Sequence, residues 1–232
     1  MADKKTAAVI LAAGSGTRMG LSVTKQRLLI AGKSILRRSL EAFDNVGSIS
    51  SITVVAREDE LDFAAEECIG IEKSINIVSG GSTRAESAAK GFFAIPVGST
   101  AVMIHDAARC LITPEEIEDI EKAVYRYGAA TASVRIVDSV KRCDKNGFIT
   151  ESIPRDGLRA MATPQAFLCD IYAQALENGS TDSSVTDDNM LVQAIGKPVF
   201  CVDTRPTNIK ITASSDIALA ELIISEREGQ PI

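Results

Sequence analysis

A glycine-rich loop near the amino terminus carries the clearest chemistry in the sequence. It reads Ala12-Ala13-Gly14-Ser15-Gly16-Thr17-Arg18-Met19-Gly20 and directly follows a short apolar run. Glycines in such a loop let backbone N–H groups approach a phosphate chain closely and curve around it. Arg18 lies within the loop and Lys25 lies just beyond it, so two cations are available for the charge of a triphosphate. The loop therefore predicts a site for a nucleoside triphosphate.

The spacing of these glycines separates the loop from two other nucleotide-binding motifs. A dinucleotide fold uses G-x-G-x-x-G, and Met19 stands where the third glycine belongs. Such a fold also places an acidic residue about twenty positions further on to hold a ribose, where this chain reads Gly32-Lys33-Ser34. The loop is not a G-x-x-x-x-G-K-[ST] P-loop either. This spacing disfavours a nicotinamide-dependent oxidoreductase, while a tight turn with surface cations remains open from the loop alone.

Short β-branched and apolar runs alternate with longer amphipathic segments along the chain. This alternation predicts a mostly parallel, twisted sheet with helices on both faces, a three-layer α/β/α domain whose ligands bind at the carboxyl ends of the strands. No linker or repeat interrupts residues 1–232, so we expect one domain. The expected strands are Ala7–Ala12, Ile52–Ala56, Ile75–Val78, Ala101–Ile104, Ala130–Val134 and Val199–Val202. The expected helices are Ile35–Phe43, Glu58–Glu67, Arg84–Ala94, Pro114–Tyr127, Phe167–Glu177 and Ser215–Arg227. We assign Phe92, Phe93, Met103, Phe167 and Phe200 to the core.

The bulk composition excludes several classes of protein. The chain has 25 Lys+Arg against 31 Asp+Glu, a net charge of -6, which gives no general attraction to nucleic acid or to an anionic membrane. One histidine and five cysteines without a C-x-x-C pair argue against a structural zinc site and fit a reducing cytosol. The first apolar run leads into the glycine-rich loop and is expected to be a strand, not a signal peptide. We expect a cytoplasmic protein without a membrane span.

The segment at about 135–159 departs from the alternation of strands and helices. It reads RIVDSVKRCDKNGFITESIPRDGLR, and polar and apolar residues alternate around Asn146-Gly147, which is a strong hairpin signal. A long polar hairpin inserted in an α/β domain has little core of its own to pack on. We interpret it as an arm that reaches a partner subunit. A surface hairpin that lies on its own domain is an equal alternative from the pattern.

Further motifs resemble those of one enzyme family. The run LAAGSGTRMG followed by Lys25-Gln26 is similar to the signature of sugar-phosphate nucleotidylyltransferases. With the later motifs it resembles the 2-C-methyl-D-erythritol 4-phosphate cytidylyltransferases (IspD) of non-mevalonate isoprenoid synthesis, in family order over nearly the whole chain. These motifs are Gly80–Ser87, His105–Arg109, Asp138–Lys141, Arg155–Leu158, Thr163–Phe167, Val185–Asp188 and Asn208–Thr212.

The resemblance implies a fold, an activity and partners. The fold is a nucleotidyltransferase domain with a dimerisation arm at about 135–159, and the protein is a homodimer joined through that arm. The activity is Mg²⁺-dependent transfer of the cytidylyl group of CTP to 2-C-methyl-D-erythritol 4-phosphate, with release of pyrophosphate. The acceptor phosphate attacks the α-phosphorus of CTP in line. Because a phosphate monoester is already anionic near neutral pH, positioning and electrostatics carry the catalysis and no general base is needed.

The resemblance also implies roles for individual residues. Asp106 is the expected Mg²⁺ ligand, since one carboxylate together with substrate phosphates suits that ion; His105 is expected to be structural. The expected catalytic residues are Arg18, Lys25 and Lys210. The expected CTP-binding residues are Ala12, Ala13, Gly14, Ser15, Gly16, Thr17, Arg18, Lys25, Gly81, Ser82, Ser87, Asp106, Ala107 and Arg109. The expected acceptor-binding residues are Arg155, Thr163, Thr186 and Lys210, with Arg155 acting across the dimer.

The sequence departs from the family pattern at two positions, and two rival functions are open. Ser82 stands where many members carry Asp, although a hydroxyl can still form a hydrogen bond. Cys110 stands where the family has Pro. A ribitol 5-phosphate cytidylyltransferase of cell-wall synthesis has the same chemistry, but the LAAG form of the first loop favours methylerythritol phosphate. A catalytically inactive nucleotide-binding module is the other rival, and it would be expected to have lost Arg18, Lys25 or Asp106.

Overall fold

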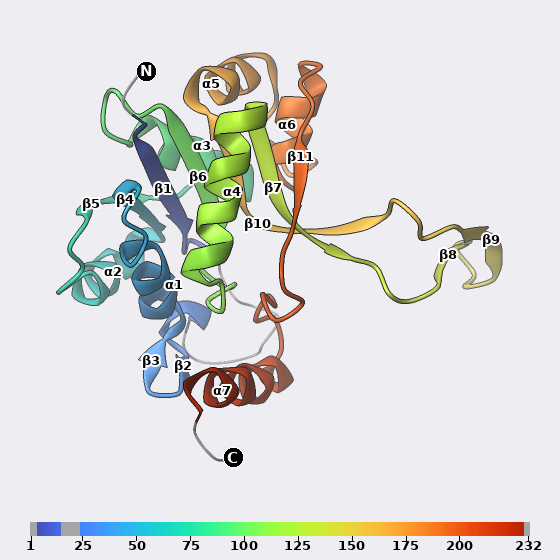
Figure 1. Cartoon of the computed structure of the whole chain (residues 1–232), viewed down its shortest axis with the longest axis horizontal. Helices are drawn as coiled ribbons and strands as arrows, with labels where there is room; N and C mark the ends of the chain where they lie inside the picture. The colour runs from blue at the N-terminus through green and yellow to red at the C-terminus, as the bar shows by residue number, and fades with distance from the viewer. Residues whose placement is uncertain (1–3, 15–23, 230–232) are drawn as a thin grey trace.

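The computed structural model describes residues 4–14 and 24–229 (Figure 1). Ser15, Gly16, Thr17 and Arg18 lie outside the described residues, so the roles expected for them stay predictions. The described chain has three layers, a central sheet between two sets of helices. This confirms the predicted α/β/α architecture. None of its described helices is long and apolar enough to cross a membrane.

The described chain forms a central seven-stranded sheet in the order β11-β7-β10-β6-β1-β4-β5. Neighbouring strands are parallel, except at β10, which is antiparallel to both β6 and β7. The sheet is therefore mostly parallel, as predicted. Its strands are β1 (Thr6–Leu11), β4 (Ile49–Ala56), β5 (Ser74–Ser79), β6 (Ala101–Asp106), β7 (Ala129–Arg135), β10 (Arg159–Leu168) and β11 (Phe200–Asp203).

The predicted start of the helix at Phe167 is wrong, because that residue belongs to strand β10. A helix was expected to begin at Phe167, but the strand continues to Leu168 and helix α5 begins at Cys169. Pro164 lies inside the strand, and the pairing with β7 is irregular around it. Because proline cannot donate a ladder hydrogen bond, it argues against a central strand when the sequence is read alone. Residues 162–167 are nevertheless buried, since β10 fills the gap between β6 and β7.

The helices cover the two faces of the sheet according to the alternation of side chains along each strand. On β1, Ala8 and Ile10 face one layer, whereas Val9 and Leu11 face the other. The first layer holds α1 (Ile35–Asp44), α2 (Leu61–Glu67) and α4 (Pro114–Tyr127). The second holds α3 (Arg84–Phe93), α5 (Cys169–Asn178) and α6 (Asp188–Ala194), the last of which was not predicted. The other elements of the body are η2 (Lys25–Arg27), β2 (Leu29–Ile30), β3 (Lys33–Ser34), η3 (Glu58–Glu60) and α7 (Ser214–Glu228).

The phenylalanines divide between the core and the surface. Phe92 and Phe167 are buried with Met103, as expected. Phe93 is 72% exposed and Phe200 is 42% exposed, so their assignment to the core was wrong. Phe93 is the last residue of α3, beyond the buried stripe of that helix. Phe200 lies on the edge strand β11 and stacks on a surface tyrosine instead.

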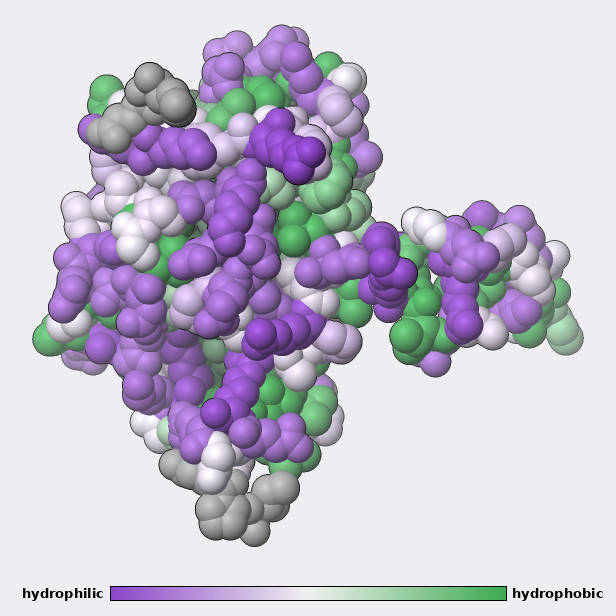
Figure 2. Space-filling model, viewed as in Figure 1, coloured by the Kyte–Doolittle hydropathy of each residue, from purple (hydrophilic) through white to green (hydrophobic). Residues whose placement is uncertain are grey.

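The segment at 135–159 forms an arm that stands away from the domain (Figure 1). Strands β8 (Val140–Cys143) and β9 (Ile149–Ile153) pair antiparallel near its tip. Gly147 in the connecting turn has φ of 90°, a conformation that favours glycine. The hairpin prediction is therefore confirmed, and the alternative in which the hairpin lies on its own domain is wrong. Hydrophobic surface is visible along the arm in Figure 2.

Helix α3 packs so closely on the sheet that Gly91 has no room for a side chain. A Cβ there would lie 2.3 Å from Val9 Cγ1 and 2.7 Å from Val55 Cγ2. Both atoms belong to the interior of the sheet, so they cannot move aside without disturbing β1 and β4.

We expect Gly91→Ala to lower the free energy of unfolding. Overpacking of this kind costs about 1–3 kcal/mol, which alanine's higher helix propensity offsets by at most about 1 kcal/mol. Urea unfolding monitored by circular dichroism measures the change. Gly47→Ala is the matched control, because nothing lies within 4 Å of a Cβ at that position. A Gly91→Ala variant as stable as the wild type would contradict the packing.

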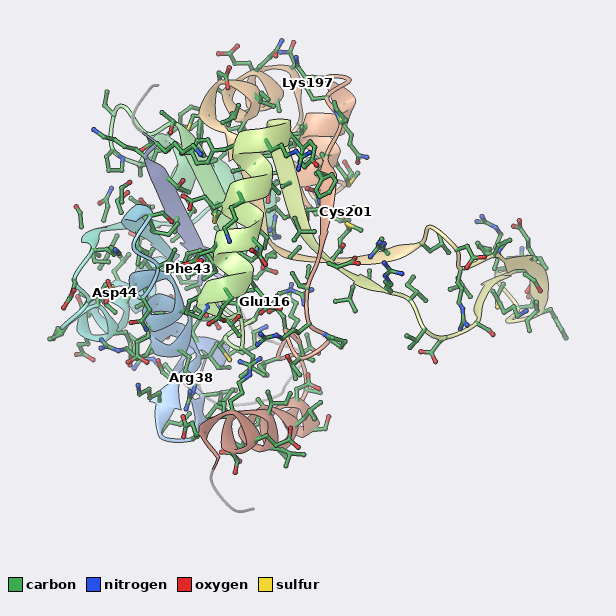
Figure 3. The ribbon with its side chains drawn as sticks, viewed as in Figure 1. Arg38, Phe43, Asp44, Glu116, Lys197 and Cys201 are labelled. Carbon is green, nitrogen blue, oxygen red and sulfur yellow. The ribbon has the colours of Figure 1, made fainter. Side chains whose placement is uncertain are left out.

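His105 lies on β6 and is fully buried. Its ring packs against Phe43 of α1, labelled in Figure 3, with the ring centroids 5.1 Å apart. Its Nδ1 lies 3.1 Å from the hydroxyl of Thr163. Burial lowers the pKa of the imidazole to about 3, so the ring is neutral at neutral pH. These contacts support the structural role expected for it.

Because His105 is neutral in the folded chain, we expect the free energy of unfolding to decrease as the pH falls. The imidazole takes up a proton near pH 6.5 in the unfolded chain, but only near a pKa of about 3 in the folded chain. Its contribution is therefore fully present above pH 6.5, and it declines by about 1.4 kcal/mol per pH unit between the two pKa values. Urea unfolding at pH 7 and pH 5 measures the slope. Because the chain has one histidine, His105→Gln should remove most of it; an unchanged slope would contradict the assignment.

Candidate active site

Loops from several strands meet at the carboxyl edge of the sheet. Asp106, the last residue of β6, is the register partner of Leu11, the last residue of β1. The described start of the glycine-rich loop therefore leaves the sheet beside Asp106. The loop after β5 approaches from the other side, and a Cβ on Gly80 would lie 2.6 Å from Ala13 Cβ. The side-chain amide of Gln26 donates to the carbonyl of Ala12 at 2.9 Å and holds the first loop; Gly14 follows in the same loop.

Two cationic side chains bind the carboxylate of Asp106. Lys210 Nζ donates to Oδ2 at 2.6 Å, and Arg84 Nε donates to Oδ1 at 3.0 Å. Asp106 is only 8% exposed. Lys210 comes from the loop before α7, and Arg84 comes from the first turn of α3. The structure thus brings together two residues predicted for the site, and it adds Arg84, to which no role had been assigned.

The charges in this cluster stabilise one another. Burial on its own raises the pKa of Asp106, but the charges of Arg84 and Lys210 outweigh it and hold that pKa well below its usual range. Burial opposes the charged form of Arg84, yet the carboxylates of Asp188 and Asp106 raise its pKa above the ordinary value. Both groups therefore remain charged across the physiological pH range.

The backbone around Asp106 is held from the neighbouring strand and from the loop before α7. The hydroxyl of Thr163 accepts a hydrogen bond from Asp106 N at 3.0 Å, and the carbonyl of Thr163 accepts from Asn208 Nδ2 at 3.0 Å. Arg109 Nη1 donates to the carbonyl of Asn208 at 2.9 Å, and Ala107 N donates to the carbonyl of Leu11 at 3.0 Å. Thr163, Ala107 and Arg109 therefore lie around Asp106, where they shape the end of β6.

The loop after β5 is held by its own side chains. Gly81 N donates to Ser87 Oγ at 3.0 Å, and Ser87 Oγ donates to the carbonyl of Thr83 at 2.9 Å. Ser82 donates both its backbone N–H and its hydroxyl to the same oxygen of Glu86, at 2.8 and 2.7 Å. These contacts fix the conformation of the loop that was expected to bind the base and ribose. The hydroxyl oxygen of Ser82 retains acceptor capacity for a ligand.

The remaining predicted residues lie in different places. Lys25 begins η2, and Thr24 separates it from the undescribed part of the loop. Thr186 is exposed, two residues before Asp188, and its hydroxyl contacts Met190 Sδ. Arg155 is also exposed and lies at the base of the arm, where it donates to the carbonyl of Val137. The structure therefore does not bring Arg155 together with Asp106 in one chain.

A metal at this site would depend on Asp106. No group of three or more His, Cys, Asp or Glu side chains that could hold a metal occurs in residues 4–14 and 24–229. A single carboxylate suits Mg²⁺, which commonly keeps several waters and takes further oxygens from substrate phosphates. Both oxygens of Asp106 already accept from cations, so an ion there would share the carboxylate with these cations or exchange with one of them. The side chain of Lys210 is the more exposed of the two partners, at 38% against 26% for Arg84.

Sequence reasoning missed Arg84 and Asp188 as parts of this site. Arg84 Nη1 donates to Asp188 Oδ2 at 2.6 Å, so the cluster continues inward from Asp106. Both residues stand within motifs that carried the family resemblance. Their positions at the starts of α3 and α6, next to loops at the carboxyl edge of the sheet, are the signal that could have found them.

Comparisons with known proteins agree with this geometry. The family model for 2-C-methyl-D-erythritol 4-phosphate cytidylyltransferase (IspD) matches residues 6–226. A cytidylyltransferase of that name from Pelotomaculum thermopropionicum is 38% identical over 230 residues, covering 97% of each chain. One from Prochlorococcus marinus is 35% identical, covering 94% of this chain and 97% of its own.

Solved structures show the same likeness. The crystal structure of 4-diphosphocytidyl-2C-methyl-D-erythritol synthase from Anaerococcus prevotii superposes with a TM-score of 0.85 at 27% identity, covering 96% of this chain and 99% of that one. The cytidylyltransferase from Thermus thermophilus superposes with a TM-score of 0.73 at 27% identity, covering 93% and 97%. The match of the family model across nearly the whole chain, together with these relatives, shows that the chain belongs to the 2-C-methyl-D-erythritol 4-phosphate cytidylyltransferase family.

Proposed function

We propose that this protein transfers the cytidylyl group of CTP to 2-C-methyl-D-erythritol 4-phosphate and releases pyrophosphate, in non-mevalonate isoprenoid precursor synthesis. The observation that carries the proposal is the Asp106–Lys210 ion pair at the carboxyl edge of the sheet. It lies beside the start of the glycine-rich loop, in a chain whose relatives are named for this activity. A carboxylate and a cation at this edge suit a metal-bound triphosphate.

In the proposed reaction an oxygen of the acceptor phosphate attacks the α-phosphorus of CTP. One phosphorus–oxygen bond forms while the bond to pyrophosphate breaks, and pyrophosphate leaves with the electron pair. The acceptor phosphate is already anionic near neutral pH, and the buried His105, with its pKa lowered to about 3, is not placed to act as a base. Lys210, Lys25 and Arg18 stabilise the negative charge around the α-phosphorus. Asp106 would hold Mg²⁺ together with the substrate phosphates, and the ion would supply charge neutralisation there.

We expect the purified protein to release pyrophosphate from CTP with 2-C-methyl-D-erythritol 4-phosphate and not with ribitol 5-phosphate. A coupled pyrophosphate assay measures the rate, and ³¹P NMR identifies the diphosphate product.

Excess EDTA should abolish turnover, because the charge of two bound polyanions must be neutralised. Lys25→Ala should lower kcat by about 10²–10³, as loss of one preorganised contact to a developing charge does. Turnover with ribitol 5-phosphate alone would overturn the acceptor assignment, and full turnover in EDTA would overturn the metal assignment.

We further propose that the active form is a homodimer joined through the arm. Val137, Phe148 and Ile149 are 75%, 71% and 66% exposed on the arm. An isolated hairpin cannot bury this apolar surface by itself, and exposed apolar surface of this kind marks a contact with another protein chain.

Arg155 lines a cavity of about 320 Å³ at the base of the arm, together with Arg135. Arg135 is paired with Asp203 and Asp156 also lines the hollow, so Arg155 is the guanidinium there that suits a phosphate. In the dimer Arg155 reaches the acceptor phosphate in the partner's site.

A mixing experiment tests the sharing of sites between two chains. Lys25→Ala and Arg155→Ala chains, each nearly inactive alone, are unfolded together and refolded. If Arg155 acts in the partner's site, one site of every mixed dimer has both residues intact. Random pairing then restores roughly a quarter of wild-type activity, as a two-fold dimer requires. If mixed dimers form and no activity returns, Arg155 does not act across the dimer.

A further inference from the structure

A chain of alternating charges runs from the edge of the sheet into the core. Lys210 Nζ and Arg84 Nε bind the two oxygens of Asp106, at 2.6 and 3.0 Å. Arg84 Nη1 then binds Asp188 Oδ2 at 2.6 Å, and the hydroxyl of Tyr172 donates to Asp188 Oδ1 at 2.6 Å. The mechanism above uses Asp106 and Lys210 but gives no task to the two inner residues.

Asp188 is held in one orientation. It is 0% exposed, and both of its carboxylate oxygens have the partners just described. Its backbone N–H donates to Gln165 Oε1 at 2.9 Å. Tyr172 is also buried and stacks on Phe167, with ring centroids 5.0 Å apart. Burial and the neighbouring Asp188 raise the pKa of Tyr172 well above its ordinary value, so the phenol keeps its proton and remains the donor.

This arrangement limits how Arg84 can bind Asp106. A guanidinium and a carboxylate prefer a bidentate pair with two parallel hydrogen bonds. Asp188 accepts from Nη1 of Arg84 and fixes the orientation of the guanidinium, which in this orientation donates to Asp106 through Nε, on Oδ1. The second oxygen, Oδ2, is left to Lys210. The two carboxylates also balance the two cations, so the cluster as a whole carries no net charge.

We propose that Asp188 is a positioning residue, which keeps Arg84 on one oxygen of Asp106 and reserves the other for an exchangeable cation. The proposal rests on the function proposed above, since the cation that exchanges with Lys210 is the divalent ion bound with CTP. Without the carboxylate of Asp188, Arg84 turns to bind both oxygens of Asp106. The cluster then also carries an excess positive charge. Both changes weaken the binding of a divalent cation at Asp106.

The test compares Asp188→Asn with the wild type. Partners that orient a metal ligand typically change metal affinity by about 10–100-fold, so we expect the Mg²⁺ concentration at half-maximal rate to rise by about that factor. At saturating Mg²⁺ we expect kcat to return to within a few-fold of the wild-type value. A second readout needs no turnover: electron paramagnetic resonance of free Mn²⁺ measures its binding to the protein with α,β-methylene-CTP, relative to the nucleotide analogue alone. Mn²⁺ affinity should fall by the same factor.

Asp187→Asn is the matched control. Asp187 is the neighbouring residue, and its side chain caps α6 by accepting from Met190 N at 3.1 Å. Asparagine is an equally good cap, so this variant should bind Mn²⁺ as the wild type does. If Asp188→Asn lowers kcat or stability with no change in either metal dependence, its role is only structural and the proposal is wrong. If the wild type itself binds no Mn²⁺ with the CTP analogue, the proposed function fails first.

Tyr172→Phe covers the case in which Asp188→Asn does not fold. This change keeps the ring stacking and removes one hydrogen bond to Asp188. A hydrogen bond to a charged group contributes more to stability than one between neutral groups, and only a part of its loss reaches the metal. We therefore expect Mn²⁺ affinity to fall by about three- to ten-fold. A folded Tyr172→Phe protein with unchanged Mn²⁺ affinity would overturn the proposal.

Discussion

The carboxylate of Asp106 is almost buried at the end of β6, and a buried charge is tolerated only where opposite charges and hydrogen bonds replace its lost hydration. Here a helix start supplies Arg84 and the loop before α7 supplies Lys210. The neighbouring strand supplies the hydroxyl of Thr163, which accepts from the backbone of Asp106. The site therefore requires β6 inside the sheet, with β1 on one side and β10 on the other. The strand order therefore decides which charged and polar groups can stabilise the carboxylate of Asp106.

The core of the domain holds these elements in place because side chains alternate between the two faces of the sheet along each strand. Each central strand sends successive side chains into two separate apolar layers. The second layer holds α3 and α6, whose first turns carry Arg84 and Asp188 of the site. Gly80 and Gly91 allow two close approaches: Gly80 between the loops after β1 and β5, and Gly91 between α3 and the sheet. Small residues at these two points let α3 lie close enough for Arg84 to reach Asp106. Packing thus determines which charges can meet.

Much of this fold is predictable from the sequence because most of its strands, helices and turns are specified by residues close together in the chain. Six sheet strands and most helices follow from short apolar runs and amphipathic periods, and the hairpin follows from Asn146-Gly147. Strand β10 is not predictable in this way, because Pro164 contradicts its central position. The inner cluster is not predictable either: Arg84 and Asp188 are 104 positions apart, as are Asp106 and Lys210. The resemblance to a family supplied the second pair, and only the folded chain shows the first.

The position of β10 also has a consequence for how the chain is made. Strands β6 and β7 leave the ribosome before the arm does, yet in the folded sheet β10 lies between them and pairs with both. At about 5–20 residues per second, the facing edges of these two strands stay open for several seconds during translation. The sheet closes only after the whole arm has emerged and the chain has returned. Exposed strand edges invite pairing with other chains, so the nascent protein passes through an interval in which chaperones protect it or aggregation competes with folding.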